Sequence, residues 1–405
     1  MAQKYVVLRD LAAGSSPIVT RSAGPMDFST GTFAGEESDP KLEVHSLDEK
    51  QVAELGKEKD VRGIAPEMPT ALIEPFAAEV SEADEAWGLG AVEAKSCPYT
   101  GRGVTVAVLD TGIDSEHVAF GGVTIVAKDF TGSESATAPD NKGHGTHCAG
   151  TIFGRDVRGK RIGVAPGIDH VFIGKVLADN GRGTSEMIFE GLKWAVERKA
   201  HVISMSLGFD FATSVRRKTD ANWPLELAVS NSLEAYRANL RMFDTLMQMV
   251  RASAAWGHEP VIVAAAGNES KIEQRPDYKI AASLPAAAEG VISVSALRPS
   301  SGSPGLFELA PFSNIYPQVS GPGVNILSAK RGSGDQLTAL SGTSMACPHV
   351  AGVAALWWEA LRMTGGGTPT GKLVTAKLRA TARANVFVPN LTAADRGDGL
   401  VTAPR

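Results

Sequence analysis

The sequence has few cysteines and little net charge. Three cysteines, Cys97, Cys148 and Cys347, stand in 405 residues; they are too few, and odd in number, for a disulfide framework, which fits a reducing compartment. The formal net charge is −5, with both signs dispersed along the chain. The sequence therefore lacks the basic footprint of a protein that binds nucleic acid or a membrane surface, and we expect neither among its partners.

Long apolar runs are also missing. The first ten residues hold no apolar core of secretory length, and no later stretch is long and apolar enough to span a bilayer. These absences predict a cytoplasmic protein and leave a leaderless route of export open. Apolar residues nevertheless make up 43% of the chain, which is enough to bury a core in one large domain or in several smaller ones.

Residues 1–76 have the pattern of a small α+β unit. Ser46-Leu-Asp-Glu49 is typical of a capping box, and it predicts a short helix over 49–58. Residues 11–40 are rich in Gly, Ser, Ala and Pro, which predicts a long loop. A unit of this size has a marginal core, so we expect it to lean on a larger neighbour. Its strands are expected over 5–9, 41–46 and 61–65.

From residue 77 onward, strand and helix signals alternate as in an α/β fold with a mostly parallel, doubly wound sheet flanked by helices. We predict two domains, 1–76 and 77–405, the second with a helical insertion over about 209–260. Apolar residues recur every three or four positions from Leu225 to about Trp256, which predicts one long helix. This helix is longer than one sheet needs; a dimer contact or a brace for the N-terminal unit would explain the excess, and the oligomeric state stays open. Strands are expected over 104–109, 171–177, 202–207, 261–266, 291–296 and 323–328.

Polar residues stand where two of these elements begin or end. Asp110 follows an apolar strand, at the edge where open α/β sheets hold their sites, although such a residue also caps turns. His144 lies between two glycines at a predicted helix start, so we expect it to be the more exposed of the two histidines. We expect His147 to be a hydrogen-bonded structural residue. A metal site on the two histidines is the alternative, but no acidic residue stands beside them at ligand spacing.

Ser344 lies in a turn of small residues that enters an apolar helix. A hydroxyl at a helix N-terminus is surrounded by unpaired backbone N–H groups, which stabilise developing negative charge; an ordinary N-cap is the alternative interpretation. Acyl transfer through serine also needs a base, a carboxylate that orients the base, and donors for the oxyanion. His144, Asp110 and Asn268 are candidates for these roles.

Four segments of the sequence resemble the motifs of the subtilisin-like serine peptidases, and they stand in that family's order. The segments are Asp110-Thr-Gly112, His144-Gly-Thr-His-Cys-Ala-Gly150, Ala265-Ala-Gly-Asn268 and Gly342-Thr-Ser-Met-Ala-Cys-Pro-His349. The resemblance extends over about 84–405. It implies a serine endopeptidase that forms an acyl-enzyme, with Ser344 as nucleophile, His144 as base and then acid, and Asp110 as the residue that orients the imidazole. It also implies that Asn268 and the Ser344 backbone N–H form the oxyanion hole.

The resemblance further implies two backbone edges that hold an extended polypeptide substrate as an added strand. Main-chain pairing demands little of the substrate's sequence, so broad specificity is expected. The first side-chain pocket is bordered by small residues, which favours large apolar substrate residues. The edges are Ser206, Leu207 and Gly208 on one side and Gly181, Arg182 and Gly183 on the other, and the pocket residues are Ala264, Ala265 and Gly267.

Residues 1–76 resemble, more weakly, the inhibitory propeptide of this family, which packs on the peptidase and sends its C-terminal end into the cleft. This resemblance implies a zymogen whose own N-terminal domain is an intramolecular inhibitor, removed by self-cleavage between about Pro66 and Asp84. An unrelated N-terminal domain is the alternative.

The sequence departs from the family at its usual strong calcium site. Ala119 stands where a ligating aspartate is expected, and residues 153–160 carry three cationic side chains, which would repel the ion. We expect that site to be absent and no cofactor to be required, with a weaker calcium site elsewhere left open.

Two cysteines follow the candidate catalytic residues closely, Cys148 after His144 and Cys347 after Ser344. Buried packing and a thiol-sensitive activity are both open interpretations of these two cysteines.

A catalytically silent peptide-binding module on the same fold is a rival function. A nucleotide-binding enzyme is a second rival, but the first predicted strand is not followed by a glycine-rich loop for phosphate.

Overall fold

The computed structural model describes residues 2–10, 40–78, 86–133, 137–254, 258–365 and 367–405. The loop predicted over 11–40 lies outside these ranges, apart from Pro40. Among the described residues, no helix combines the length and the apolar character that a bilayer span requires.

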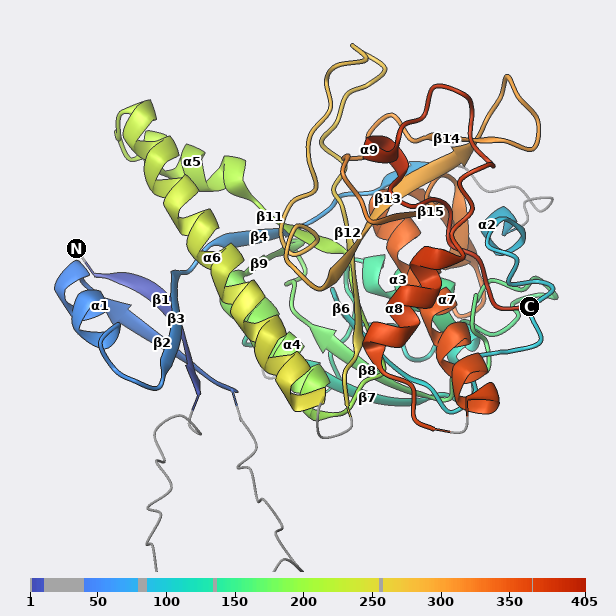
Figure 1. The fold of residues 1–405 in the computed structure, drawn as a ribbon, viewed down its shortest axis with the longest axis horizontal. Coiled ribbons are helices and arrows are strands. Elements are labelled where there is room, and N and C mark those ends of the chain that lie inside the picture. The colour runs from blue at the N-terminus through green and yellow to red at the C-terminus, as the bar shows by residue number, and fades with distance from the viewer. Residues whose placement is uncertain (1, 11–39, 79–85, 134–136, 255–257, 366) are drawn as a thin grey trace, which may run out of the picture.

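The centre of the molecule is an eight-stranded sheet (Figure 1). Its strands are β6 (Thr105–Asp110), β7 (Thr124–Asp129), β8 (His170–Lys175), β10 (Val202–Met205), β12 (Val261–Ala265), β13 (Val291–Pro299), β14 (Phe307–Leu309) and β15 (Val319–Pro322). The order is β14-β13-β12-β10-β6-β8-β7, with β15 against β13. The β13–β14 pair is antiparallel and the other described pairs are parallel. The predicted α/β fold with a mostly parallel sheet is therefore confirmed.

Helices cover both faces of this sheet, which is why its strands are continuous apolar runs. Val106 and Val108 of β6 pack into the core on one face, and Ala107 and Leu109 pack into the core on the other. The first face is covered by α3 (His144–Phe153), α7 (Thr343–Thr364) and α8 (Gly371–Ala380), and the second by α4 (Ser185–Glu197) and α6 (Leu225–Ala254). The other helices of this part of the described chain are α2 (Trp87–Ala91), η2 (Val118–Phe120), α5 (Phe211–Asp220) and α9 (Ala393–Arg396).

The N-terminal unit is a three-stranded antiparallel sheet with one helix. The strands are β1 (Gln3–Asp10), β2 (Pro40–Leu47) and β3 (Val61–Pro66), in the order β2-β1-β3, and the helix is α1 (Glu49–Leu55). The capping box expected at Ser46 and Glu49 is wrong, because Ser46 stays in β2, paired with Lys4. Asp48 caps α1 instead, together with Gln51.

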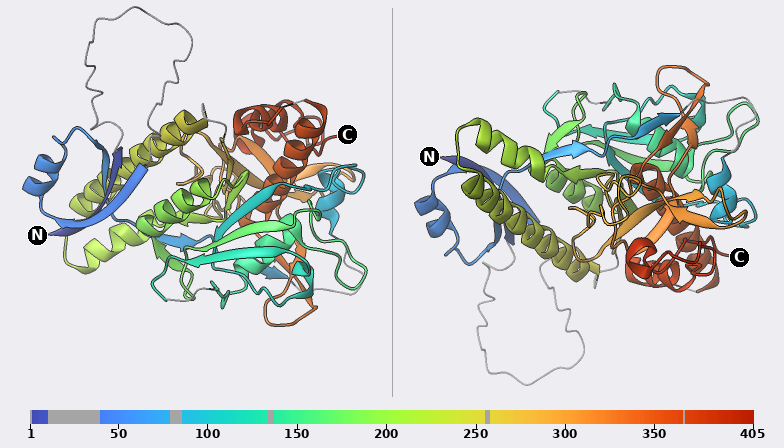
Figure 2. Two further views of the ribbon diagram at one scale, coloured as in Figure 1. Left: turned by 90° about the horizontal axis from the view of Figure 1, so that it is seen from below. Right: turned by 90° about the horizontal axis from the view of Figure 1, so that it is seen from above.

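Helix α6 separates the N-terminal sheet from the central sheet (Figures 1 and 2). Val6 and Leu8 of the N-terminal sheet share a core with Met242 of α6. The Asn239 side-chain amide donates to the backbone oxygen of Pro66, 2.8 Å away. Of the two explanations for the length of this helix, the contacts therefore favour the brace for the N-terminal unit.

The segment that leaves the N-terminal sheet crosses the carboxyl end of the central sheet in extended form. Its first part, β4 (Pro69–Leu72), lies between β9 (Arg182–Thr184) and β11 (Leu207–Phe209) and is antiparallel to both. Its second part, β5 (Phe76–Ala78), pairs with β17 (Leu337–Ser341), whose other neighbour is β16 (Ile326–Ala329). The domain boundary after residue 76 stays a prediction, and it falls inside β5.

Candidate active site

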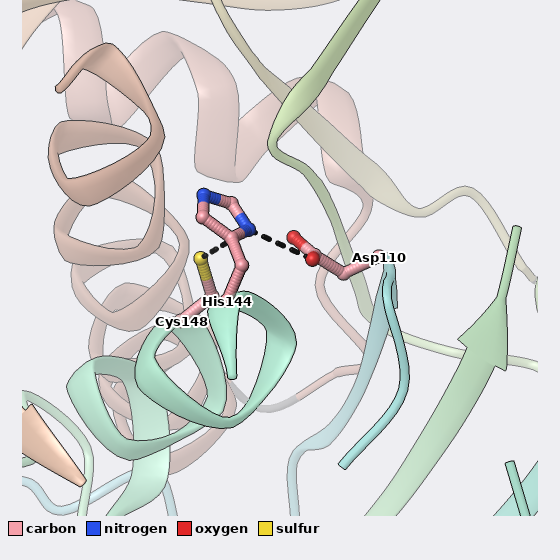
Figure 3. Close-up of side chains that lie close together, drawn as sticks. All are labelled: Asp110, His144 and Cys148. Carbon is pink, nitrogen blue, oxygen red and sulfur yellow. Dashed lines mark hydrogen bonds and ion pairs between the residues drawn. The ribbon is translucent and has the colours of Figure 1, made fainter. Parts of the chain in front are cut away.

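Asp110 and His144 are in direct contact at the carboxyl end of the central sheet. Asp110 ends β6, and His144 is the first residue of α3, where Gly143 at the N-cap has φ +93°, a conformation that favours glycine. The imidazole Nδ1 lies 2.8 Å from Asp110 Oδ1 (Figure 3). Both histidines are buried, and His144 is the more exposed of the two by a small margin, 2% against 0% for His147. The Nε2 of His144 is buried and has no hydrogen-bond partner, so this nitrogen is left to accept a proton.

A second buried carboxylate, Asp140, fixes the start of α3. Its Oδ1 accepts from the backbone N–H of Gly143 at 2.7 Å, and its Oδ2 accepts from that of Thr146 at 2.8 Å. Oδ1 also accepts from the Thr111 hydroxyl at 2.8 Å, which ties the helix to the residue after Asp110. Because these bonds satisfy N–H groups that a helix start leaves unpaired, the position of His144 relative to Asp110 is fixed.

The charges around His144 favour its protonated form. Burial lowers the pKa of His144, but the charge of Asp110 and its hydrogen bond outweigh burial, and Asp140 and Glu74 add to the effect. The net pKa lies above the ordinary value of 6.5. His147 behaves oppositely, because burial lowers its pKa to about 3. Its Nε2 lies 2.8 Å from the Ile326 oxygen, as a structural histidine would.

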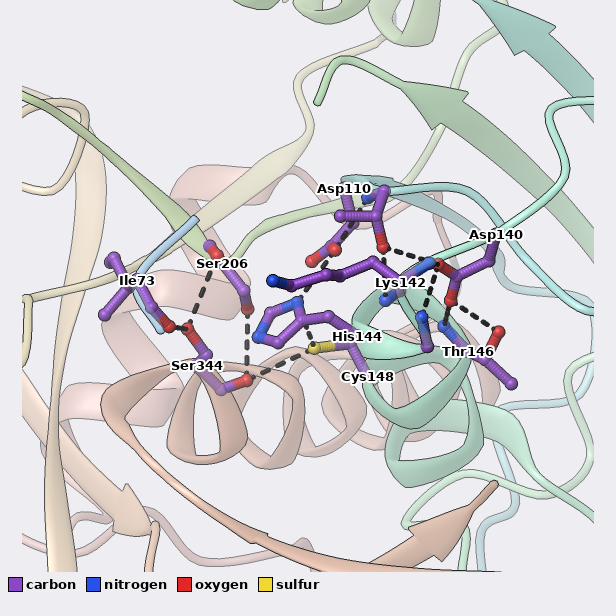
Figure 4. Close-up of polar contacts among 12 residues, drawn as sticks. Ile73, Asp110, Asp140, Lys142, His144, Thr146, Cys148, Ser206 and Ser344 are labelled. Atoms are coloured by element: carbon purple, nitrogen blue, oxygen red, sulfur yellow. Dashed lines mark hydrogen bonds and ion pairs between the residues drawn. The ribbon is translucent and has the colours of Figure 1, made fainter. Parts of the chain in front are cut away.

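Ser344 lies in the first turn of α7, close to the His144 side chain (Figure 4). Gly342 is the N-cap of this helix, so Ser344 is not an ordinary cap. The Ser344 hydroxyl donates to the oxygens of Ile73 at 3.3 Å and Ser206 at 3.4 Å. The Cys148 sulfur lies 3.8 Å from His144 Nδ1 and 3.4 Å from the backbone carbonyl oxygen of Ser344. Ser344 and His144 are thus gathered into one cluster.

The side-chain amide of Asn268 is the next group of this site, and it reaches the segment that also contacts Ser344. Its Oδ1 accepts from the backbone N–H and the hydroxyl of Thr343, each at 2.9 Å, which leaves Nδ2 facing outward. Nδ2 donates to the Glu74 oxygen at 3.1 Å. A Cβ on Gly342 would lie 2.9 Å from that Nδ2, so the close approach of the amide requires glycine there.

The predicted substrate-binding edges are occupied by the protein's own segment. Ala71 is paired with Gly208 and with Arg182, Leu72 with Leu207, and Thr70 with Gly183. The Leu72 N–H donates to the Gly181 oxygen at 2.8 Å. Ser206 and Ser344 contact each other twice. The Ser206 hydroxyl donates to the backbone oxygen of Ser344 at 3.1 Å, and the Ser344 hydroxyl donates to the backbone oxygen of Ser206.

The Ile73 side chain is buried beside Gly208. A Cβ on Gly208 would meet Ile73 Cγ1 at 3.6 Å and Ser283 Oγ at 3.2 Å. Of the expected pocket residues, Ala265 ends the buried strand β12, and Gly267 has φ +119° and donates from its N–H to the Thr343 hydroxyl.

Metal-ligating side chains also meet here. Within the described part of the chain, Asp110, His144 and Cys148 form a group whose ligand atoms lie within 4.8 Å of one another. Burial raises the pKa of Cys148 well above its ordinary value, whereas a metal needs the thiolate. The Nδ1 of His144 already faces Asp110 Oδ1. The group therefore fits a hydrogen-bonded cluster better than a metal site.

Four residues in this cluster escape the sequence prediction. Asp140 lies just outside a recognised motif and Thr343 lies inside one, and both orient motif residues. Ile73 and Glu74 come from a distant segment. An acidic residue four positions before His144 is the available signal for Asp140, and the Gly-Thr-Ser motif is the signal for Thr343.

Comparison with known proteins gives the family. A model of the subtilase family matches residues 101–399. The chain is 34% identical over 323 residues to a thermostable alkaline protease of Halalkalibacterium halodurans, which covers 77% of this chain and 74% of that protein. It is 33% identical over 287 residues to the major intracellular serine protease of Bacillus subtilis, with 70% and 74% covered. For subtilisin E of Bacillus subtilis the identity is 32% over 318 residues, with 77% and 68% covered. The chain belongs to the subtilase family of serine peptidases, and as such it is a hydrolase.

Proposed function

We propose that this chain is an endopeptidase of broad specificity that works through an acyl-enzyme on Ser344 and is made as a self-processed zymogen. The observation that carries the proposal is the convergence of four side chains from distant segments: Asp110, His144, Asn268 and Ser344. The 2.8 Å contact between Asp110 and His144 and the unpartnered Nε2 supply an oriented base.

The chemistry follows from these groups. His144 Nε2 takes the Ser344 hydroxyl proton as Oγ bonds to the substrate carbonyl carbon. The oxyanion accepts from Asn268 Nδ2 and the Ser344 N–H. The protonated ring then gives its proton to the leaving amine as the C–N bond breaks, and water activated by the same ring hydrolyses the acyl-enzyme. In the zymogen the Ser344 hydroxyl is turned to two carbonyls, so attack first requires it to turn to Nε2.

The N-terminal domain is proposed as an intramolecular inhibitor. Three facts support this: β4 fills the two edges expected to bind substrate, the Ile73 carbonyl faces Ser344, and Ile73 is buried beside Gly208. The Ile73–Glu74 bond lies beside the nucleophile, within the predicted range 66–84. Asn268, however, holds the Glu74 carbonyl rather than that of Ile73. For cleavage of the Ile73–Glu74 bond, the segment must move so that Asn268 binds the Ile73 carbonyl in place of the Glu74 carbonyl. We therefore expect this cleavage to be slow.

Polypeptide substrates follow from the family. A relative named as an intracellular serine protease supports the expectation of a cytoplasmic location.

Expression of the wild type beside Ser344→Ala tests both parts of the proposal. We expect the wild type to hydrolyse unfolded protein and to split at Ile73–Glu74, or elsewhere within 66–84, on a denaturing gel with fragment masses. The variant stays full length and inactive. An active wild type that remains full length would remove the zymogen part alone. An inactive wild type would favour the rival interpretation, a silent peptide-binding module.

A further inference from the structure

A lysine stands beside the reacting centre and has no part in the chemistry proposed above. Lys142 precedes the candidate base His144 by two residues. Its Nζ lies 3.1 Å from Oε1 of Glu74. In Figure 4 its side chain extends from the start of α3 in the direction of Ser206 and Ser344. An ammonium group is thus held at the cleft, close to the bond that faces the nucleophile.

Glu74 occupies a defined position relative to that bond. The Ile73 carbonyl accepts from the Ser344 hydroxyl, so Glu74 is the first residue on the leaving-group side of the Ile73–Glu74 bond. Its own carbonyl is held by Asn268 Nδ2 at 3.1 Å, and its side chain turns back over the other edge, where a Cβ on Gly181 would lie 3.4 Å from Oε1. Both its backbone and its side chain are therefore bound.

The charges near Lys142 leave its ammonium group available to Glu74. The nearby carboxylate of Asp179 is already bound, by Lys175 Nζ at 2.7 Å and by the Asn141 amide at 2.9 Å. A second cation, Arg331, donates to Asn141 Oδ1 at 3.0 Å. Among these groups, Lys142 is thus the cation that pairs with Glu74.

We propose that Lys142 is a specificity-determining residue that selects an acidic side chain at the first substrate position after the cleaved bond. The inference rests on the proposed function, because it treats the segment through Glu74 as a stand-in for substrate. The carboxylate of such a substrate takes the place of Glu74, and the charge it brings is the one that the Lys142 ammonium attracts. The substrates favoured are polypeptides with Glu or Asp after a large apolar residue.

The size of the effect follows from exposure. The side chains of Lys142 and Glu74 are 34% and 62% exposed, so the pair is screened by solvent and resembles a surface ion pair. We expect kcat/KM to favour Glu over Gln by about threefold, and Glu over Lys by about tenfold because attraction is replaced by repulsion.

The test uses the purified full-length chain, allowed to process itself, and three internally quenched peptides of sequence Thr-Ala-Leu-Ile-Xaa-Ala-Phe with Glu, Gln or Lys at Xaa. We expect kcat/KM in the order Glu, Gln, Lys for the wild type. Lys142→Gln loses the preference, and Lys142→Glu reverses it. Lys372→Glu, the same charge change on the exposed surface of α8, keeps the wild-type order. Labelling by a fluorophosphonate probe verifies that each variant has an assembled site.

Two results overturn the inference. Equal cleavage of the three peptides by the wild type, or the wild-type order in a labelled Lys142→Glu variant, contradicts the inference alone. Cleavage of none of the peptides by the wild type contradicts the proposed function, and the inference with it.

Discussion

Single residues set the protonation state of the site. Burial by itself would keep His144 neutral, but Asp110 at 2.8 Å, Asp140 and Glu74 together hold its pKa above 6.5. In the proposed mechanism His144 must be neutral to accept a proton, so these carboxylates stabilise the imidazolium of that mechanism at the cost of activity in acid.

The direction of the His144 pKa shift determines how activity depends on pH. Because the pKa of His144 is raised, the fraction of enzyme with a neutral base falls as pH drops through the raised value. We expect the acidic limb of kcat/KM against pH to have its midpoint above 6.5, the ordinary value for histidine. Asp140→Asn removes one of the charges that raise the pKa and moves the limb to lower pH. A midpoint below 6.5 in the wild type would contradict this electrostatic account.

Asn268 has a separable role. Its Nδ2 donor is aimed by two hydrogen bonds from Thr343, so its loss removes a preorganised donor and leaves the base in place. We expect Asn268→Ala to lower kcat by about 10²–10³ with little change in KM, as for loss of such a donor in a subtilisin. Asn268→Asp keeps the acceptor for Thr343 but not the donor, and is expected to be equally slow. Wild-type kcat in both variants would exclude the oxyanion role.

At this scale the sequence predicts the groups that we propose to carry out the chemistry better than the groups that orient them. Asp110, His144, Asn268 and Ser344 stand in recognisable local motifs, and the structure gathers them at one end of the sheet. The Asp140 carboxylate accepts from five backbone and hydroxyl donors, and no single residue type in the sequence indicates such an arrangement. The flanking glycines predict that His144 is more exposed than His147, but other segments bury both side chains, to 2% and 0% exposure.

At the scale of elements, strand β4 occupies the two edges that we propose to bind substrate. It is paired on both edges, with β9 and β11, and the side chain that follows it, Ile73, is 4% exposed. Main-chain pairing supplies affinity without sequence demand, while the buried isoleucine supplies apolar contact. Sequence periodicity does not predict this strand, because its partners are the edges of two distant loops rather than its neighbours along the chain.

Shortening Ile73 tests that arrangement. Ile73→Ala removes about three buried carbon groups, or about 2 kcal/mol of apolar burial at about 0.8 kcal/mol each, which is about thirtyfold in the population with an open cleft. The measurement is hydrogen exchange of residues 69–78 in the Ser344→Ala background, where self-cleavage cannot intervene. We expect exchange there to rise, while Leu373→Ala, an exposed control (45% exposed), leaves it unchanged. Unchanged exchange in Ile73→Ala would show that the isoleucine does not hold the segment.

At the scale of the whole molecule, the N-terminal sheet and the peptidase share one core across α6. Val6, Leu8, Ala65 and Met68 belong to the same buried cluster as Met242 and Leu246. A small sheet with one helix buries little apolar surface alone, so this shared core is its main support. The periodicity of α6 predicts the helix, but the surface that it offers to another unit is visible only once both are folded.

Charge placed in that shared core is expected to separate the two units. Met242 is 1% exposed, and Met242→Asp would bury a carboxylate without a partner, a change that costs several kcal/mol. We expect the processed N-terminal fragment to co-elute with the wild-type peptidase in size-exclusion chromatography and to dissociate in the variant. Leu227→Asp, at the exposed start of α6 (58% exposed), is the control and retains the complex. Co-elution in Met242→Asp would contradict the shared-core account.

Mass-spectrometric localisation of a fluorophosphonate adduct tests the central claim most directly, because the reagent reacts with a serine hydroxyl only where a base and an oxyanion hole activate it. We predict a single adduct on the peptide that contains Ser344, lost in Ser344→Ala and strongly slowed in His144→Ala. An adduct on another residue, or labelling that survives in Ser344→Ala, would contradict the assignment of the nucleophile.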